Sequence, residues 1–461
     1  MEVKSITLNN IGRFDELEIQ LAPLGRQYGN TTVFVGNNGS GKTSILKALA
    51  TSLSWLVSRI QTESGKGSPI PELVIKNGSP SAAIDLTVFN HVEGNIEDGD
   101  LEGLDGNYFP WRIAKSRKGR KGEHKSDYWG ATALADHYRS SISANDKSSL
   151  PLIAFYSVER VVIEIPLKIR EKHTFLQLDG YDKSLSQGVD FRRFFEWFRE
   201  REDTENESGL SDDIFEQLKG VLGDDQETWS KLNQLKASNK DRQLTAVRSA
   251  IYKFMPEFSN LKVRRKPRLH MSIDKNGQAL NVAQLSQGEK SLMALIGDIA
   301  RRLAVMNPAM KNPLKGDGIV LIDEVDMHLH PKWQRTLIAQ LTSTFPNCQF
   351  VLTTHSPLVI SDSKDVLTYL IEEDGVTPLS SLYGLSCNDV LDEVMSSEGH
   401  NEQLSRNSHV FSELEMINAL IADEKYSEAQ EKILELEKEI GDEIPELVSA
   451  KLSIDLVGWD D

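Results

Sequence analysis

The sequence predicts an α/β fold in which a parallel sheet carries polar residues at the carboxyl ends of its strands. Three observations support this fold class. Residues 33–35 are an apolar run that leads into a glycine-rich turn and then a helical pattern over 44–49. Residues 319–322 are continuously apolar, as expected of a central strand covered on both faces. A third run, 349–353, also ends in polar residues, and the carboxyl edge of such a sheet is where ligands bind.

The glycine-rich turn matches the pattern Gly-x-x-x-x-Gly-Lys-Ser/Thr, which cradles nucleotide phosphates. Glycines let the backbone approach the phosphates, so that successive N–H groups and the helix N-terminus bind them. Lys42 would reach the β- and γ-phosphates, and the Thr43 hydroxyl would ligate Mg²⁺. The plain alternative is a glycine-rich turn before a helix. The predicted ATP-binding residues of this turn are Gly36, Asn37, Asn38, Gly39, Ser40, Gly41, Lys42, Thr43 and Ser44.

Three further polar residues follow the other two predicted strands. Asp323 ends the run 319–322, where it would hold Mg²⁺ through water, and Glu324 comes next. A carboxylate at that position suits a general base for the attacking water, a role that contributes about 10²–10⁴-fold to a rate. His355 follows 349–353 and is predicted to contact the γ-phosphate or the water, although a histidine after a strand is more often structural.

The motif Leu285-Ser286-Gln287-Gly288-Glu289 precedes an amphipathic helical pattern from Ser291 to about Val305. Ser286 and Gly288 therefore lie at a helix N-terminus, where amides, a hydroxyl and the positive end of the dipole suit a γ-phosphate. The alternative is a helix cap, because Ser286 with Glu289 three residues later forms a capping box. Both roles can hold together.

These motifs, in this order, resemble the RecF/SMC-like branch of ABC ATPases. Residues 323–334, Asp-Glu-Val-Asp-Met-His-Leu-His-Pro-Lys-Trp-Gln, are similar to a segment of the ATPases of Septu anti-phage systems (the PtuA family), including retron-associated versions. The resemblance covers residues 1–60, 150–165 and 260–375. It implies an ABC-type P-loop ATPase head that binds ATP and Mg²⁺.

The same resemblance implies partners. Two heads would pair on ATP, with Ser286 and Gly288 capping the nucleotide held by the other subunit, and larger oligomers are expected. The Septu resemblance implies a separate HNH-type nuclease regulated by this ATPase. The alternative is a RecF-like DNA repair ATPase that binds DNA directly. A transporter ATPase is disfavoured because the chain shows no coupling features of that class.

The length of the chain excludes two classes of protein that carry a related ATPase head. Between the first and second motifs lie roughly 240 residues without sustained heptads, so the long coiled-coil arm of SMC proteins is excluded. After His355 only 106 residues follow (461 minus 355), without the acidic strand-end pattern of a metal-dependent nuclease domain. We therefore expect no nuclease activity in this chain.

The spaces between the motifs predict the domain organisation. The apolar strand 153–158 ends where related ATPases sense the γ-phosphate with a glutamine, and Glu159 and Arg160 are the candidate sensors here. The expected segments are 1–60, first part of the head; 61–150, a β-rich insertion lobe with a basic loop; 151–183, the head strand with the sensor; 184–259, a helical insertion; 260–375, second part of the head; and 376–461, an acidic helical region.

The acidity of the chain is confined to its tail. From Ile371 to Asp461 there are 23 Asp and Glu against 5 Lys and Arg, a net charge of −18. Because the whole chain carries −17, the remainder carries +1. Such a tail would repel nucleic acid and suit a basic protein partner. Residues 421–429 resemble a tetratricopeptide half-repeat, which cannot bury its apolar face alone and should pack on the head or on a partner.

Two basic clusters contrast with the tail. One, 262–268, alternates as a strand would, and the other is a glycine-containing loop flanked by aromatic residues. Basic residues beside aromatic residues can bind single-stranded nucleic acid, although charge runs are more often solvated loops. The candidate nucleic-acid contacts of the loop are Lys115, Arg117, Lys118, Arg120 and Lys121.

Composition indicates a cytoplasmic protein with no membrane partner. The chain begins Met-Glu-Val-Lys-Ser, without an apolar leader, and no apolar run approaches the ~20 residues of a membrane span. Two cysteines, Cys348 and Cys387, make a disulfide framework unexpected, and neither has metal-ligating neighbours in the sequence.

Overall fold

The structure is a computed structural model in which the chain forms two compact units, Met1–Tyr383 and Gly384–Asp461. Each unit is described separately. The residues that the structure describes are 1–23, 29–90, 108–158, 175–186, 191–208, 240–266, 268–372, 375–386, 390, 408–423, 425–440 and 445–457.

The first unit is built on a six-stranded sheet with the order β13-β12-β3-β11-β10-β6. Five strands run parallel and the edge strand β13 is antiparallel. The parallel strands are buried along their whole length, which explains their continuous apolar sequences. The predicted α/β fold is confirmed. The strands are β3 (Thr31–Val35), β6 (Leu152–Tyr156), β10 (Gly318–Ile322), β11 (Cys348–Thr353), β12 (Leu367–Ile371) and β13 (Val376–Pro378).

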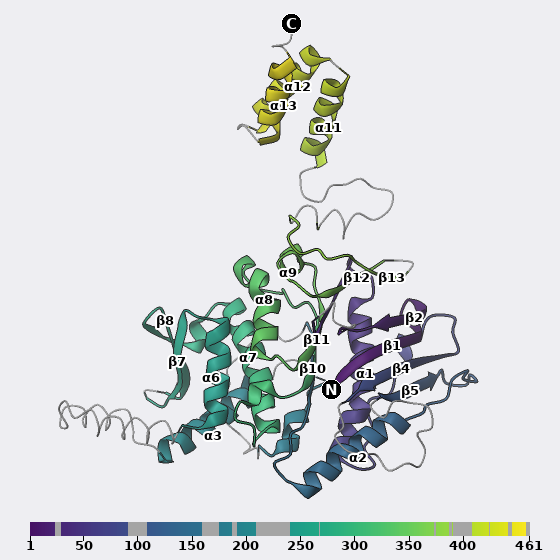
Figure 1. The fold of residues 1–461 in the computed structure, drawn as a ribbon, viewed down its shortest axis with the longest axis vertical. Helices are drawn as coiled ribbons and strands as arrows, with labels where there is room; N and C mark the ends of the chain where they lie inside the picture. The colour runs from purple at the N-terminus through teal and green to yellow at the C-terminus, as the bar shows by residue number, and fades with distance from the viewer. Residues whose placement is uncertain are drawn as a thin grey trace, which may run out of the picture. The chain divides into compact units, whose positions relative to one another are not determined.

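A second sheet, antiparallel with the order β2-β1-β4-β5, lies beside the first. Helix α1 (Lys42–Gln61) contacts strands of both sheets, and α2 (Trp129–Ala144) packs on α1 (Figure 1). The buried side chain of Gln349 on β11 hydrogen-bonds to the Val3 backbone and so ties the two sheets together. The strands are β1 (Glu2–Ile11), β2 (Phe14–Gln20), β4 (Ser81–Phe89) and β5 (Tyr108–Ser116).

The stretch 61–150, expected as an insertion lobe, thus contributes β4 and β5 to the sheet that β1 and β2 begin. Strand β4 pairs with β1, the first strand of the chain, β5 pairs with β4, and α2 packs on the helix that follows the glycine-rich turn. The structure therefore integrates this stretch with the head. The predicted boundary at residue 60 marks no separate lobe within the described residues.

A helical layer lies on the other side of the central strands in Figure 1 and contains α6, α7 and α8. Helix α7 is buried on nearly every side and contacts α3, α6 and β6. A small antiparallel sheet, β7-β8-β9, adjoins α6. The elements are α3 (Phe191–Ser208), α6 (Arg242–Phe254), β7 (Phe258–Arg264), β8 (His270–Lys275), β9 (Gln278–Asn281), α7 (Gln287–Met306), α8 (Pro331–Thr344) and α9 (Pro357–Ser361).

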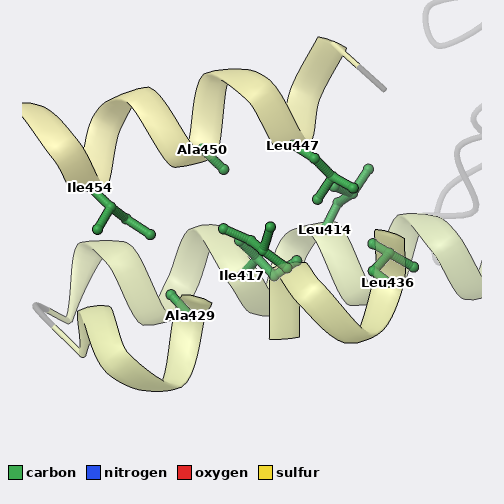
Figure 2. Packing of buried hydrophobic residues seen from close by; sticks show 8 residues of the cluster. Leu414, Ile417, Ala429, Leu436, Leu447, Ala450 and Ile454 are labelled. Carbon is green, nitrogen blue, oxygen red and sulfur yellow. The ribbon is translucent and has the colours of Figure 1, made fainter. Parts of the chain in front are cut away.

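The second unit includes the helices α11 (Ser408–Ala422), α12 (Tyr426–Ile440) and α13 (Pro445–Val457). The expected helix pair around 421–429 is present, but the expectation that it must bury its apolar face on the head or on a partner is wrong. Helix α13 supplies the third wall of a core formed within the unit (Figure 2). The core residues are Leu414, Ile417, Ala429, Ile433, Leu436, Leu447, Ala450 and Ile454.

None of the helices that the structure describes is both long enough and apolar enough to cross a membrane.

Candidate nucleotide site

The glycine-rich turn lies between β3 and α1, as predicted, and its glycines are required by geometry. Gly36, Gly39 and Gly41 all have positive φ, at 142°, 81° and 106°. A Cβ atom on Gly36 would lie 2.4 Å from the Ile371 carbonyl oxygen, and one on Gly41 would lie 2.7 Å from the Phe14 ring. A side chain at Gly36 or Gly41 would therefore clash with the protein itself, whether or not a phosphate is bound.

The turn fits a phosphate group. Ser40 is buried, and its hydroxyl lacks a hydrogen-bond partner among the described residues. A buried hydroxyl without a partner costs free energy unless a ligand or water satisfies it. Asn37 and Asn38 are exposed at the tip of the turn, while Thr43 and Ser44 are half-buried in the first turn of α1.

Lys42 is 6% exposed, and its ammonium donates hydrogen bonds to the Gly36 carbonyl at 2.7 Å and the Asn37 carbonyl at 2.9 Å. Burial lowers the pKa of Lys42 to about 8, although nearby carboxylates, Glu324 foremost, act in the opposite direction. The ammonium is held inside the turn by two neutral carbonyls, so a phosphate would offer it a stronger, charged acceptor.

Thr43 and Asp323 meet across 280 positions of sequence. The Thr43 hydroxyl donates to the Asp323 carboxylate, with oxygen–oxygen distances of 3.1 and 2.9 Å, and Asp323 is only 1% exposed. One carboxylate and one hydroxyl are the protein ligands that Mg²⁺ uses when substrate phosphates and water complete its shell. Within the described ranges no cluster of three or more His, Cys, Asp and Glu side chains could hold a metal. The pair therefore fits a metal bound together with a nucleotide.

Thr353, at the end of β11, bonds to the Asp323 carboxylate and to the backbone of Glu324. Its hydroxyl donates to Asp323 at 2.6 Å and accepts a hydrogen bond from the backbone N–H of Glu324 at 2.7 Å. Glu324 has a φ of 45°, a conformation that costs free energy and persists only where surrounding contacts enforce it. Sequence reasoning missed Thr353. Thr353 directly follows Leu352, which pairs with Ile322 at the end of β10, so Thr353 lies beside Asp323 on the neighbouring strand.

The loop after Glu324 is fixed by side chains of α8 and of the segment after β11. The Gln334 amide donates to the Asp326 and Leu329 carbonyls and accepts a hydrogen bond from the Ser356 hydroxyl at 2.9 Å. Thr354 donates to the Asp326 carboxylate. Gln334 appeared in the resemblance only as part of a motif, and these contacts give its physical role.

His355 is half-buried between the turn and the acidic loop. Burial lowers the pKa of His355, and the neighbouring Lys42 lowers it further, while Asp326, Glu324 and Asp323 partly offset both effects. The imidazole is therefore mainly neutral near pH 7. The structure brings His355 into the electrostatic environment of Lys42, Asp323 and Glu324, which the sequence order alone could only suggest.

Ser286 caps α7 through a complete capping box. Its hydroxyl accepts from the Glu289 N–H at 3.3 Å, and the Glu289 carboxylate accepts from the Ser286 N–H at 2.8 Å. Lys275 of β8 donates to the same carboxylate at 2.6 Å. A Cβ atom on Gly288 would lie 2.3 Å from the His328 carbonyl, so this glycine lets the helix start pack on the loop after Glu324.

Two predicted groups remain to be placed. Glu159 and Arg160 lie outside the described residues, although the strand before them, β6, pairs with β10 as a sensor strand would. In the basic loop, Arg117 has a structural role, because its guanidinium donates to the Ile75, Lys76 and Ser79 carbonyls. The side chains of Lys115, Lys118, Arg120 and Lys121 are exposed.

The fold and the site together define a P-loop ATPase of the ABC/SMC-like class, and comparisons with known proteins agree. A family model described as "AAA ATPase domain" matches residues 1–86. A second, described as "AAA domain, putative AbiEii toxin, Type IV TA system", matches residues 145–361.

Curated relatives identify the family. The chain is 38% identical over 397 residues to the "Retron Ec83 probable ATPase" of Escherichia coli, covering 78% of this chain and 69% of the relative. It is 32% identical over 429 residues to the "Retron Vc95 probable ATPase" of Vibrio cholerae serotype O1 biovar El Tor, covering 87% and 81%. The chain belongs to this family of retron ATPases.

Other similarities are more distant. The chain is 25% identical over 216 residues to the Septu protein PtuA of Bacillus thuringiensis, covering 42% of this chain and 53% of the relative. Among solved structures, an SMC head bound to the C-terminal winged-helix domain of ScpA matches with a TM-score of 0.44 and 16% identity, covering 82% of this chain and 98% of that chain.

Proposed function

We propose that this protein is a switch that binds Mg·ATP, pairs head to head and hydrolyses the nucleotide slowly to reset. The observation that carries the proposal is the hydrogen-bonded chain Thr43–Asp323–Thr353–Glu324, which joins the glycine-rich turn to the candidate base. It connects the Asp323 carboxylate and the backbone of Glu324 to Thr43 at the start of α1, where the phosphates would lie.

Each step follows from side chains already described. Lys42 would exchange its two carbonyl acceptors for phosphate oxygens. Thr43 and Asp323 would hold Mg²⁺, which when bound neutralises phosphate charge. Glu324 would orient a water and accept its proton, and neutral His355 would contact the γ-phosphate or that water. These roles use positioning and electrostatics, as phosphoryl transfer requires.

Pairing would use the start of α7. Ser286 and Gly288 lie at a helix N-terminus, and the Ser286 N–H is already committed to Glu289. The amides that follow and the positive end of the helix dipole suit the γ-phosphate of a second head. ATP would then join two copies of the chain, and hydrolysis would release them.

The defence context comes from the relatives, which are named for retrons and for the Septu system. We propose that ATP-dependent pairing regulates a partner HNH-type nuclease bound through the acidic C-terminal unit. The alternative, a RecF-like DNA repair ATPase, would bind DNA directly. A gene neighbourhood with an HNH endonuclease or a reverse transcriptase would favour the first.

The nucleotide chemistry is tested by two substitutions. Lys42→Ala should abolish ATP binding measured by calorimetry. Glu324→Gln should retain binding, accumulate ATP-dependent dimers in light scattering, and hydrolyse at least about 10²-fold more slowly. A Glu324→Gln protein with the wild-type rate would show that Glu324 is not the base.

A further inference from the structure

A second pocket lies apart from the glycine-rich turn. It has a volume of about 350 Å³ and lies between the start of α6 and the segment 311–314, which includes most of the 3₁₀ turn Pro313–Lys315. That volume is in the range of small-ligand sites. The polar residues that line it are Lys240, Arg242, Thr245, Ser249, Lys311 and Asn312.

The charge in this pocket is all of one sign. Lys240, Arg242 and Lys311 line it, and no acidic residue is among the described residues that do. Asp241, which lies between Lys240 and Arg242 in the sequence, and Glu205 are engaged in other contacts. Asp241 accepts from the Leu244 N–H at 2.8 Å and pairs with Arg201 of α3 at 3.3 Å. Glu205 of α3 accepts from Arg248 at 2.8 Å.

Three cations around one cavity repel one another, and that repulsion is relieved when an anion enters. The hydroxyls of Thr245 and Ser249 add neutral donors on the same wall. A phosphate group accepts several hydrogen bonds at once, and charge-assisted bonds from lysine and arginine are roughly twice as strong as neutral ones. The pocket therefore suits a phosphate in preference to a cationic or purely apolar ligand.

The pocket is distinct from the ATP site. Its Lys311–Leu314 wall leads into the amino end of β10, whereas Asp323 follows the carboxyl end of that strand. A strand of this length spans roughly 17 Å. A phosphate in the pocket would therefore not be one cradled by the glycine-rich turn of the same head.

We propose that this pocket binds a phosphate group, carried either by the backbone of single-stranded nucleic acid or by a free phosphorylated ligand. The test starts from Lys42→Ala, so that the glycine-rich turn does not compete. Inorganic pyrophosphate is titrated by calorimetry, and fluorescein-labelled single-stranded DNA is titrated by fluorescence anisotropy. Charge reversal in K240E/K311E should weaken binding about tenfold or more, because two charge-assisted contacts are lost.

The matched control is K66E/K147E, which makes the same charge change at exposed lysines outside the pocket and should alter affinity less than about twofold. Weaker binding of both probes assigns the pocket to a nucleic-acid backbone, and weaker binding of pyrophosphate alone assigns it to a free ligand. Equal affinities in pocket and control variants, or no binding of either probe, overturn the proposal. If circular dichroism shows K240E/K311E unfolded, the milder Lys311→Gln decides by the same comparison.

Discussion

At the scale of single residues, the site depends on a threonine with no chemical role of its own. Thr353 is fully buried, and its one hydroxyl serves both Asp323 and the strained backbone of Glu324. A hydroxyl can donate once and accept twice, so one side chain bonds both to the proposed metal ligand, Asp323, and to the backbone of the proposed base, Glu324. A shift of about 1 Å at such a position can cost on the order of 10²-fold in rate.

Thr353→Val tests this role, because valine keeps the shape and removes the hydroxyl. The Glu324 N–H would lose its acceptor, so we expect the unfolding free energy to fall by about 1–3 kcal/mol. Hydrolysis should fall at least about tenfold, with ATP affinity nearly unchanged. Urea unfolding and steady-state ATPase assays measure both effects. Thr353→Ser is the control and should restore most of the rate; a valine variant with wild-type rate and stability would remove Thr353 from the mechanism.

The residues of the ATP site were predictable to the extent that they belong to local motifs. Gly36, Lys42, Thr43, Asp323 and Glu324 lie where the sequence placed them, on the turn after β3 and at the end of β10. Thr353 and Gln334 were not predicted, because their roles arise from hydrogen bonds between elements distant in sequence. The structural contacts of Arg117 were missed for a related reason, since its carbonyl partners lie on a segment some forty positions earlier.

At the scale of elements, the sequence allowed two roles for the start of α7, a helix cap and a contact with the γ-phosphate of a second head. The structure shows the cap. The capping box and the salt bridge from Lys275 show that Ser286 stabilises the helix start. Hydrogen bonds from Lys275 and Ser286 lower the pKa of Glu289 against the opposing effect of burial, so the carboxylate stays charged and keeps the box closed. Capping does not exclude contact with a second head, and substitutions can separate the two.

Ser286→Asp should keep the cap, because aspartate caps as well as serine, while its charge repels a γ-phosphate. We expect thermal stability close to wild type, intact ATP binding by one head, and loss of ATP-dependent dimers in light scattering. Ser286→Ala should do the reverse, costing about 1 kcal/mol of stability and impairing pairing less. If Ser286→Asp formed ATP-dependent dimers as readily as the wild type, Ser286 would not cap the nucleotide held by a second head.

The second sheet shows that the pattern of a single strand does not predict which strand it pairs with. The sheet depends on the pairing of β4 with β1, which joins segments about eighty positions apart, while β5 pairs with β4. Period and composition fix which face of a strand is buried but do not choose its neighbour. The stretch was therefore expected as a separate lobe, whereas it completes the sheet that covers α1.

At the scale of the whole molecule, the acidic region is a folding unit with its own core. The sequence predicted residues 376–461 to be helical but did not identify the helix 445–457 as part of a core, because its apolar residues, Leu447, Ala450 and Ile454, give a weak pattern beside the exposed Val448 and Leu452. Three helices close a core that two could not. The acidic side chains therefore belong to a folded helical unit, and a docking site requires such a structured surface.

Truncation after Tyr383 should keep ATPase activity within about twofold, since Met1–Tyr383 is a compact unit by itself, and should release a partner nuclease in a pull-down. Docking by exposed charge should also weaken with salt, because such attraction is screened over about 8–10 Å near physiological ionic strength.

The converse variant replaces Lys115, Lys118, Arg120 and Lys121 with serine and keeps Arg117, whose contacts are structural. It should weaken nucleic-acid binding, if that loop provides it, and spare the partner. An insoluble truncated protein, or one that retains the partner at full strength, would show that the second unit does not serve as the docking site.

The self-contained core of the second unit bears on how this family could diversify. Recombination near residue 384 would exchange the core cluster of α11–α13 as a whole for another. Substitutions on the outer faces of α11–α13 would likewise not disturb the hydrogen bonds that hold Thr353 and Glu324 in place. Partner choice could thus evolve quickly, under pressure from changing phages, while the catalytic machinery is inherited unchanged.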